Sequence, residues 1–296
     1  MSIENLVQQG DFEGALALLT QENAVARPDP GQLLMAFNLE VRLQRFEAAE
    51  ASMRRLIQLT PDLAEPMGAL SRTARAEAVA TARLVDPAVA GRRAALGTPP
   101  PHGLVYVKAA VLHAQKDYAG AAAALEEAKA QTPAATGTMT WKNGRTARFL
   151  DLTDTDELTG PILPCYSGDT VLDLPYSQLR SVNFLEGRMS FDVMWMPAEI
   201  VTTTGKSLTL RVPAFYVGTG KAEMPQARTG QMTLWERSHG YAQGIGQRDF
   251  KVSTEGGGMS MVGILQIRRI DFDVKPGAAT EGEPEKPKGF WKRIFG

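Results

Sequence analysis

The stretch "AQKDYAGAAAALEEAKAQTPAATGTMTWKNGRTARFLD", residues 114–151, contains the change of pattern that decides the fold. Up to Thr132-Pro133 it is rich in alanine and reads as a helix, which proline ends because it has no backbone N–H. After about residue 137 the alanines disappear, and Asn143-Gly144, two residues that tolerate positive φ, indicates a β-hairpin. The sequence therefore predicts a helical half followed by a half rich in strands.

The helical half repeats one short pattern. Phe12, Phe46 and Tyr118 are each followed three positions later by an alanine, and positions 12 and 46 lie 34 residues apart, the tetratricopeptide (TPR) period. The small residue lets one helix approach its partner, and the aromatic ring fills the space between helix pairs. We predict a degenerate, all-α TPR-like repeat domain over residues 1–135, with a groove for an extended segment or a partner helix.

Further turn signals divide the rest of the chain. Gly168-Asp169 predicts a second hairpin, and alternation in "MVGILQIRRIDFDV", residues 261–274, predicts a long strand. We predict a mostly antiparallel α+β domain over residues 136–274. Residues 275–296 are predicted to be a flexible linker rich in Pro, Gly, Glu and Lys that ends in a short basic-aromatic segment.

Composition limits the classes of function. The chain has 296 residues, of which 44% are hydrophobic, and a formal net charge of -1, which does not suit a nucleic-acid-binding protein. A single cysteine, Cys165, excludes an internal disulfide framework and suits a reducing compartment. The N-terminal residues lack the pattern of a secretory signal, and no run approaches the ~18 apolar residues of a membrane span. These features predict a soluble, cytoplasmic protein.

Two patterns that could indicate a phosphate-binding or a metal-binding site do not meet the requirements of such sites. Gly205-Lys206-Ser207 matches the end of a phosphate-binding loop, but the first glycine of that motif is replaced by Ile200. The following "SLTLRVP" alternates as a strand does, so Gly205-Lys206 is predicted to be a hairpin tip. The three histidines, His102, His113 and His239, are scattered without the spacing of metal ligands. We therefore predict no catalytic residue, no cofactor and no metal site.

One acidic cluster keeps an alternative open. Asp154, Asp156 and Glu157 lie close together in "DLTDTDELTGP", residues 151–161. A short helix capped by Asp154 is the favoured interpretation. The alternative is an enzyme or a small-molecule-binding protein, which would bring Asp156 and Glu199 into one cleft with perturbed acidity.

Several short motifs in the second half occur together, the most specific being "DVMWMPAEI" at residues 192–200. On these motifs the chain resembles the TagJ/ImpE family of type VI secretion system accessory proteins, over most of its length to about residue 273. The residues that match the family motifs are Asp154, Asp156, Gly160, Pro161, Pro175, Asp192, Trp195, Pro197, Ala198, Glu199, Pro213, Tyr216, Gly218, Gly246, Gln247 and Arg248. One motif departs from the family, since Phe215 stands where the family tends to have an arginine.

The resemblance implies a non-enzymatic adaptor for protein partners. It implies binding to the N-terminal helix of the small sheath subunit and a link to the AAA+ ATPase that recycles contracted sheaths. The structural interpretation of the motif is that Trp195 is core and that Glu199 satisfies backbone donors at a turn after Pro197. A generic TPR scaffold unrelated to secretion stays open as a further alternative.

The C-terminal segment carries a separate signal. On a helix its four large apolar residues would share faces beside a cluster of cations, as interface anchors do. The candidate partner-docking residues are Phe290, Trp291, Ile294 and Phe295. Packing of this segment against its own domain and weak attachment to a membrane surface are the alternatives.

Overall fold

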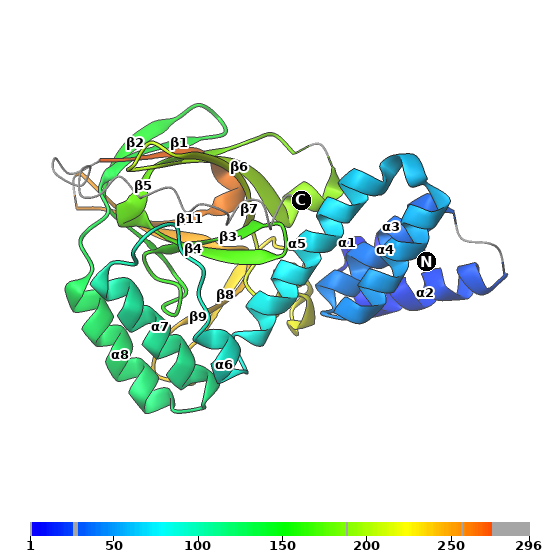
Figure 1. Cartoon of the computed structure of the whole chain (residues 1–296), viewed down its shortest axis with the longest axis horizontal. Helices are drawn as coiled ribbons and strands as arrows, with labels where there is room; N and C mark the ends of the chain where they lie inside the picture. Colours follow the sequence, from blue (N-terminus) through cyan, green and yellow to red (C-terminus); the bar gives the residue numbers. More distant parts are fainter. Residues whose placement is uncertain (1, 26–28, 188, 256, 274–296) are drawn as a thin grey trace, which may run out of the picture.

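The computed structural model describes residues 2–25, 29–187, 189–255 and 257–273. Helices occupy the first half and strands the second, as the change of pattern near residue 137 predicts (Figure 1). Within these ranges, no helix is both long enough and apolar enough to cross a membrane.

The helices of the first half are joined by short turns. They are α1 (Ile3–Gln8), α2 (Phe12–Val25), α3 (Pro30–Arg42), α4 (Phe46–Leu59), the 3₁₀ turn η1 (Pro61–Leu63), α5 (Ala64–Ala82), α6 (Pro87–Ala90), α7 (Pro101–Ala114) and α8 (Tyr118–Gln131). As Thr132-Pro133 predicts, α8 ends at Gln131, and α4 likewise ends at Leu59, two residues before Pro61.

The three aromatic positions of the sequence repeat begin three helices with the same turn before them. Phe12, Phe46 and Tyr118 are the first residues of α2, α4 and α8. Two residues before each aromatic, the backbone takes a positive φ: 75° at Gly10, 58° at Gln44 and 66° at Lys116. The repeated sequence pattern therefore encodes one kind of corner between paired antiparallel helices.

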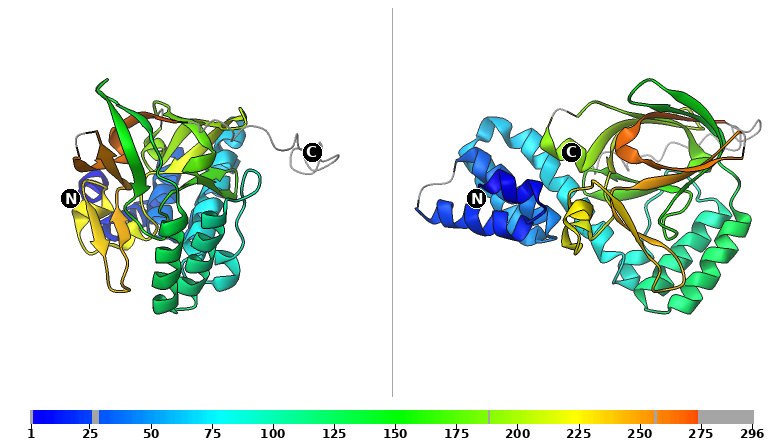
Figure 2. Two further views of the ribbon diagram at one scale, coloured as in Figure 1. Left: turned by 90° about the vertical axis from the view of Figure 1, so that its left-hand side faces the viewer. Right: turned by 180° about the vertical axis from the view of Figure 1, so that it is seen from behind.

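The continuous TPR-like stack is not confirmed. Helices α1–α4 form two adjacent pairs with α5 against α4, whereas α7 and α8 lie apart from them on another side of the strands (Figures 1 and 2). The reason is the intervening chain: α5 is 19 residues long and packs against β3 and β4, which carries the following residues away from the first two pairs.

The strands form one large sheet and one small one. The strands are β1 (Gly137–Trp141), β2 (Thr146–Asp154), β3 (Ile162–Ser167), β4 (Thr170–Pro175), β5 (Leu179–Phe184), β6 (Trp195–Thr202), β7 (Ser207–Pro213), β8 (Thr233–Glu236), β9 (Gln243–Gly246), β10 (Asp249–Thr254), β11 (Met259–Gly263) and β12 (Ile267–Phe272). Ten of them pair in the order β11-β10-β2-β1-β12-β5-β6-β7-β3-β4, and β8 pairs with β9. The paired strands are antiparallel, as predicted.

The short elements between strands are mostly 3₁₀ turns. They are η2 (Tyr176–Gln178), η3 (Ser190–Val193), η4 (Thr219–Lys221), η5 (Ile264–Gln266) and the short helix α9 (Pro225–Arg228). The long strand predicted over residues 261–274 is instead divided, because η5 separates β11 from β12. The two parts then join different regions of the sheet, β11 beside β10 and β12 between β1 and β5.

The predicted hairpin tips are confirmed. Gly144, Gly168 and Gly205 have φ values of 84°, 60° and 82° in the turns that join β1 to β2, β3 to β4 and β6 to β7. A side chain at such a φ is strained, which is why glycine is required there. Gly205-Lys206 is thus the tip of a hairpin and not part of a phosphate loop.

The large sheet curls until two of its regions meet. After β7, Tyr216 N–H donates to Gly246 O at 3.0 Å, and Arg248 N–H donates to Ala214 O at 2.8 Å. A bridge between Phe215 and Gln247 lies between these two bonds. The segment after β7 is therefore joined to the segment before β10, and the curled sheet encloses an apolar core.

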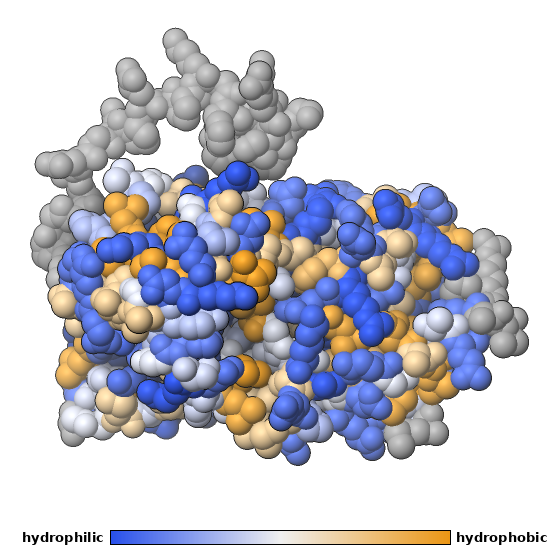
Figure 3. Space-filling view, turned by 90° about the horizontal axis from the view of Figure 1, so that it is seen from below, coloured by the Kyte–Doolittle hydropathy of each residue, from blue (hydrophilic) through white to orange (hydrophobic). Residues whose placement is uncertain are grey.

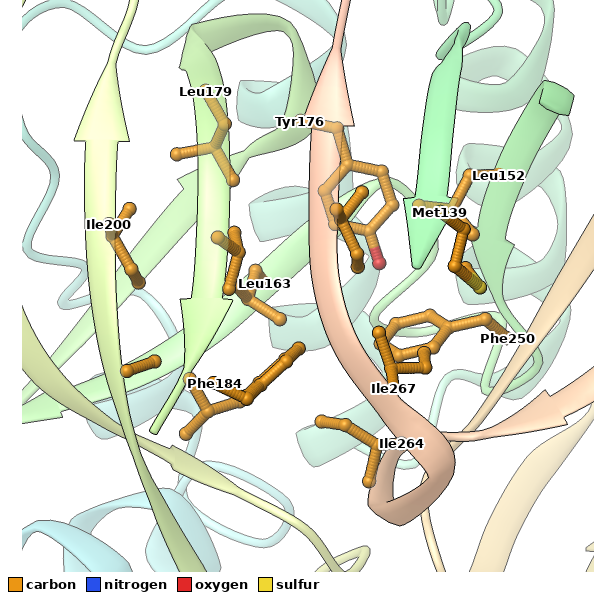
Figure 4. Packing of buried hydrophobic residues seen from close by; sticks show 14 of the residues in the cluster. Met139, Leu152, Leu163, Tyr176, Leu179, Phe184, Ile200, Phe250, Ile264 and Ile267 are labelled. Atoms are coloured by element: carbon orange, nitrogen blue, oxygen red, sulfur yellow. The ribbon is translucent and has the colours of Figure 1, made fainter. Parts of the chain in front are cut away.

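Two hydrophobic cores hold the large sheet together and join it to the helices of the first half. The first fills the curled sheet with side chains such as Leu163, Ile200 and Phe250 (Figure 4). The second joins the helices to the sheet: it includes residues of α3, α4 and α5 together with Tyr166, Phe191 and Trp195. Trp195 is 1% exposed, so its structural interpretation as a core residue is confirmed.

We predict that Trp195→Ala lowers the free energy of unfolding by about 3–5 kcal/mol, because it leaves a cavity between the two halves. Chemical denaturation followed by circular dichroism measures the change. The matched control is Trp235→Ala, since Trp235 is 41% exposed. A loss for Trp195→Ala no larger than for the control would contradict a joining role for this residue.

Candidate functional site

Several of the predicted motif residues lie where the curled sheet closes. Asp154 is the last residue of β2, Tyr216 follows β7, and Arg248 precedes β10. The guanidinium of Arg248 forms a salt bridge with the Asp154 carboxylate, and both residues are 4% exposed. Arg248 Nε also donates to Pro213 O at 3.1 Å. One arginine thus links the ends of three strands.

Tyr216 completes this cluster. Its hydroxyl donates to Asp154 Oδ1 at 2.6 Å and accepts from the backbone N–H of Asp249 at 3.1 Å. Burial raises the pKa of Asp154 above its usual value, and the Arg248 charge and the Tyr216 hydrogen bond oppose that shift. Burial also raises the pKa of Tyr216, so its hydroxyl stays protonated and available as a donor.

The motif from Asp154 to Pro161 is a tight turn. Asp156 Oδ1 accepts from Leu158 N–H at 2.9 Å, and its Oδ2 accepts from Gly244 N–H at 3.0 Å. Gly160 has a φ of 52°, and a Cβ there would meet the ring of Tyr106. The predicted short helix beginning at Asp154 is wrong, because β2 extends to this residue and the following backbone folds around the Asp156 carboxylate.

The third carboxylate of the cluster serves a different contact. Glu157 Oε2 accepts from Ala242 N–H at 2.6 Å, and Glu157 Oε1 forms a salt bridge with Lys129 of α8 at 3.0 Å. Burial acts to raise the pKa of Glu157, but the hydrogen bond from Ala242 N–H and then the Lys129 ammonium lower it below its usual value. The three carboxylates thus bind donors of the protein itself, an arrangement that stabilises structure.

The "DVMWMPAEI" motif holds the junction between the two halves. Asp192 forms a salt bridge of 2.7 Å with Arg211, and Asp192 Oδ2 accepts from Met189 N–H at 3.0 Å. Trp195 Nε1 donates to Glu77 Oε2 at 3.2 Å. Pro197 and Ala198 continue into β6. These contacts fix the entry of β6 against α5.

Glu77 is the residue of this junction that the sequence analysis missed. Its Oε2 also accepts from the Tyr166 hydroxyl at 2.6 Å, and burial raises the pKa of its carboxyl above the usual value. The sequence does contain a pattern that indicates this residue. The apolar stripe of α5 includes Leu70 and Ala74, and the next position at helical spacing is Glu77, so a carboxyl interrupts the stripe.

Glu199 does not join these residues. It is exposed on β6, where its nearest polar partner is the side-chain amide of Asn183 at 3.4 Å. Both expectations for it are wrong: it lies within a strand and not at a turn, and β1, β12 and β5 separate its strand from β2 and hence from Asp156. Alternation along β6 points its side chain away from the core.

The remaining motif residues shape the backbone around the closure. Gly218 and Gly246 have φ values of 87° and 103°, and a Cβ at Gly246 would collide with Met232 O. Gln247 Oε1 accepts from Leu265 N–H at 3.2 Å. Of the four motif prolines, Pro175 and Pro213 are the last residues of β4 and β7.

Phe215, which replaces the family arginine, lies beside a cation from another element. The guanidinium carbon of Arg42, at the end of α3, is 5.8 Å from the centre of the Phe215 ring and 5.1 Å from that of Phe12. Arg42 Nε donates to Asn38 Oδ1 at 2.9 Å, and burial lowers the pKa of Arg42 to about 10. A guanidinium thus reaches this position from α3.

Two of the scattered histidines come together in space. His113 Nδ1 lies 2.6 Å from the Tyr241 hydroxyl, and the His239 ring stacks on Tyr118 at 3.7 Å between ring centres. The centres of the two imidazole rings are 5.8 Å apart. In the ranges that the structure describes, no group of three or more His, Cys, Asp or Glu side chains could hold a metal ion. The candidate docking residues Phe290, Trp291, Ile294 and Phe295 lie outside those ranges.

Comparison with known proteins agrees with the pattern of motifs. Residues 146–271 match the model of the ImpE protein family. The chain is 26% identical over 277 residues to the type VI secretion system accessory component TagJ of Pseudomonas aeruginosa, covering 92% of each chain. Its fold is similar to the crystal structure of a Vibrio parahaemolyticus protein, with a TM-score of 0.78 and 17% identity over 92% of this chain and 97% of the other.

We predict that Arg248→Met lowers the free energy of unfolding by about 3–5 kcal/mol at neutral pH, because Asp154 then becomes a buried unpaired charge. The double variant Asp154→Asn/Arg248→Met removes that charge and recovers at least half of the loss. Arg269→Met, which breaks an exposed pair with Asp271, is the control and changes the free energy by less than about 0.5 kcal/mol. Equal effects of Arg248→Met and the control would contradict a stabilising role of this ion pair in the closed sheet.

A second prediction concerns pH. Burial, and then the charge of Asp154, raises the pKa of Asp156 to about 6 from an ordinary value of 3.8. Between these values the folded state holds a proton that the unfolded state has released, so this stabilisation is complete below the lower pKa and is lost as the pH rises through about 6.

Relative to the unsubstituted protein, Asp156→Asn should therefore be more stable at pH 7 than at pH 4, by up to about 3 kcal/mol. Urea unfolding of both proteins at the two pH values measures this difference, in which effects of the substitution that do not depend on pH cancel. Parallel pH profiles for the two proteins would show that Asp156 keeps its ordinary acidity.

Proposed function

We propose that this chain, which belongs to the TagJ/ImpE family, is an accessory component of a type VI secretion system that acts by binding other proteins. The observation that carries this proposal is the similarity to TagJ across nearly the full length of both chains, which includes the helical half as well as the ImpE-like half. In the proposed function, the two predicted domains, residues 1–135 and 136–274, move together as one rigid body.

The chemistry of the motif residues supports a non-enzymatic role. The buried carboxylates bind internal donors, and Glu199 lies away from them, so the carboxylate pair that the enzyme alternative requires is not formed. Instead the conspicuous motif residues close the sheet or join the two halves. These residues stabilise one fixed fold, which a protein that presents binding surfaces requires.

The proposed partner is the N-terminal helix of the small sheath subunit, with a link to the AAA+ ATPase that recycles sheaths, in the cytoplasm. Exposed apolar side chains of the helical half are candidate contacts for such a helix, either at Leu63 beside the first helix pairs or at Leu104 on the separate α7–α8 pair. The face in Figure 3 shows hydrophobic residues in small groups among hydrophilic ones. Such a mixed surface suits a reversible partner.

We predict saturable binding of the full chain to a peptide of the sheath subunit's N-terminal helix, measured by calorimetric titration. Leu63→Asp with Leu104→Asp should weaken binding at least tenfold, because a charge then replaces apolar contact on the helical half. Met259→Asp with Met261→Asp, equally exposed on the sheet half, should leave the affinity unchanged.

The titrations test the identity of the partner and the location of its binding site separately. The reverse pattern among the two pairs of variants would move the binding site to the sheet half and keep the partner. No binding by the unsubstituted chain at high micromolar peptide, with a scrambled peptide as the reference, would remove the sheath helix as a partner.

A further inference from the structure

A groove of about 700 Å³ lies beside the sheet closure, and its lining includes Asp154, Glu157 and Gly160 of the site described above. Its floor is the outer face of β2, β10 and β11, where Thr153, Lys251 and Met261 lie side by side in register. One wall is the end of α8 with the chain that follows it, and the other is the β8–β9 hairpin. The volume is that of a site for a large ligand or a short peptide.

The groove presents apolar side chains to solvent. Met259 and Met261 are 62% and 53% exposed on the edge strand β11, and Trp235 is 41% exposed on β8. Methionine adapts its shape and makes favourable contacts with aromatic rings, and Trp is a frequent interface anchor. An occupant with aromatic side chains therefore suits the groove.

The charges in the groove are of both signs. Lys251 and Arg237 are cations of the floor and of the hairpin wall, whereas Asp151 is an acid at the opposite side, where it accepts from Ala135 N–H at 3.4 Å. Lys129 and Glu157 neutralise each other. A fitting occupant carries carboxylates and cations on either side of its apolar residues.

The chain itself leaves the described structure at the rim of this groove. Asp273 N–H donates to Thr136 O at 2.9 Å, and Ala134, two residues before Thr136, lines the groove. Two residues span at most about 7 Å and the hydrogen-bonded pair adds about 5 Å, so the rim lies within roughly 12 Å of Asp273, the residue after β12. Residues 274–289 number 16, and a flexible chain of that length spans about 20–24 Å on average.

The sequence beyond that point has the composition that the groove requires. Glu281, Glu283 and Glu285, followed by Lys286 and Lys288, precede the aromatic residues Phe290 and Trp291, and the cations Lys292 and Arg293 come after them, before Ile294 and Phe295. The carboxylates come first along the chain and can face Lys251 and Arg237, while the cations that follow can face Asp151.

We propose that residues 290–295 of the same chain bind in this groove, with Phe290 and Trp291 against Met259, Met261 and Trp235. A short tether keeps the segment at an effective concentration near the millimolar range, so a weak intrinsic affinity is sufficient. A partner that uses the groove would then compete with the segment. This inference does not depend on the sheath partner, because it concerns one chain alone.

Photo-crosslinking in the full-length protein tests the proposal. Trp291→p-benzoylphenylalanine places a photoreactive group in the segment, and peptide mapping by mass spectrometry locates its products. We expect crosslinks to Met259, Met261 or Trp235 within one chain. A mixture of light and isotopically heavy protein distinguishes crosslinks within a chain from those between chains.

A matched pair of substitutions gives the control. Met261→Lys should reduce the crosslink yield at least fivefold, whereas Leu63→Lys, at an exposed apolar residue of the helical half, should not change it. Both positions are on the surface, and circular dichroism checks that the fold is kept. Crosslinks to other regions, crosslinks only between chains, or an unchanged yield in Met261→Lys would overturn the proposal.

Discussion

The salt bridge between Arg248 and Asp154 is the interaction on which the sheet half depends. A sheet of ten strands exposes its edges and its inner face unless it curls back on itself. Here the curl is closed by a few backbone bonds between residues 214–216 and 246–248, and the buried ion pair with Tyr216 holds these segments in register. A buried charge without its partner is strongly unfavourable. Any arrangement that separates Arg248 from Asp154 while keeping them buried is therefore much less stable than the closed sheet.

A second polar contact sets the position of the helical half. Glu77 of α5 accepts hydrogen bonds from Trp195 and Tyr166, which belong to the sheet half, inside an otherwise apolar interface. Apolar packing is non-directional, whereas these two bonds require one orientation of α5 on the sheet. The same α5 separates α7–α8 from the first helix pairs, so one helix explains both the rigid junction and the broken repeat.

In this chain the predicted motif residues mainly stabilise the structure. Asp154, Asp192, Trp195, Tyr216 and Arg248 are buried and bind within the chain. Partner surfaces are expected elsewhere, on exposed apolar residues of the helices or in the groove beside β11. Phe215 also makes an internal contact, since the Arg42 guanidinium lies over its ring.

The sequence by itself determined the division near residue 137, the helix corners before Phe12, Phe46 and Tyr118, and the hairpin tips at Gly144, Gly168 and Gly205. These features are local, because proline, glycine and periodicity act within a few residues. Tertiary structure alone decided that α7–α8 leaves the first helix pairs, that Asp154 ends a strand and that Glu199 is remote from it. Those outcomes depend on contacts between residues far apart in the sequence, such as Asp154 with Arg248 at 94 positions, which no local pattern records.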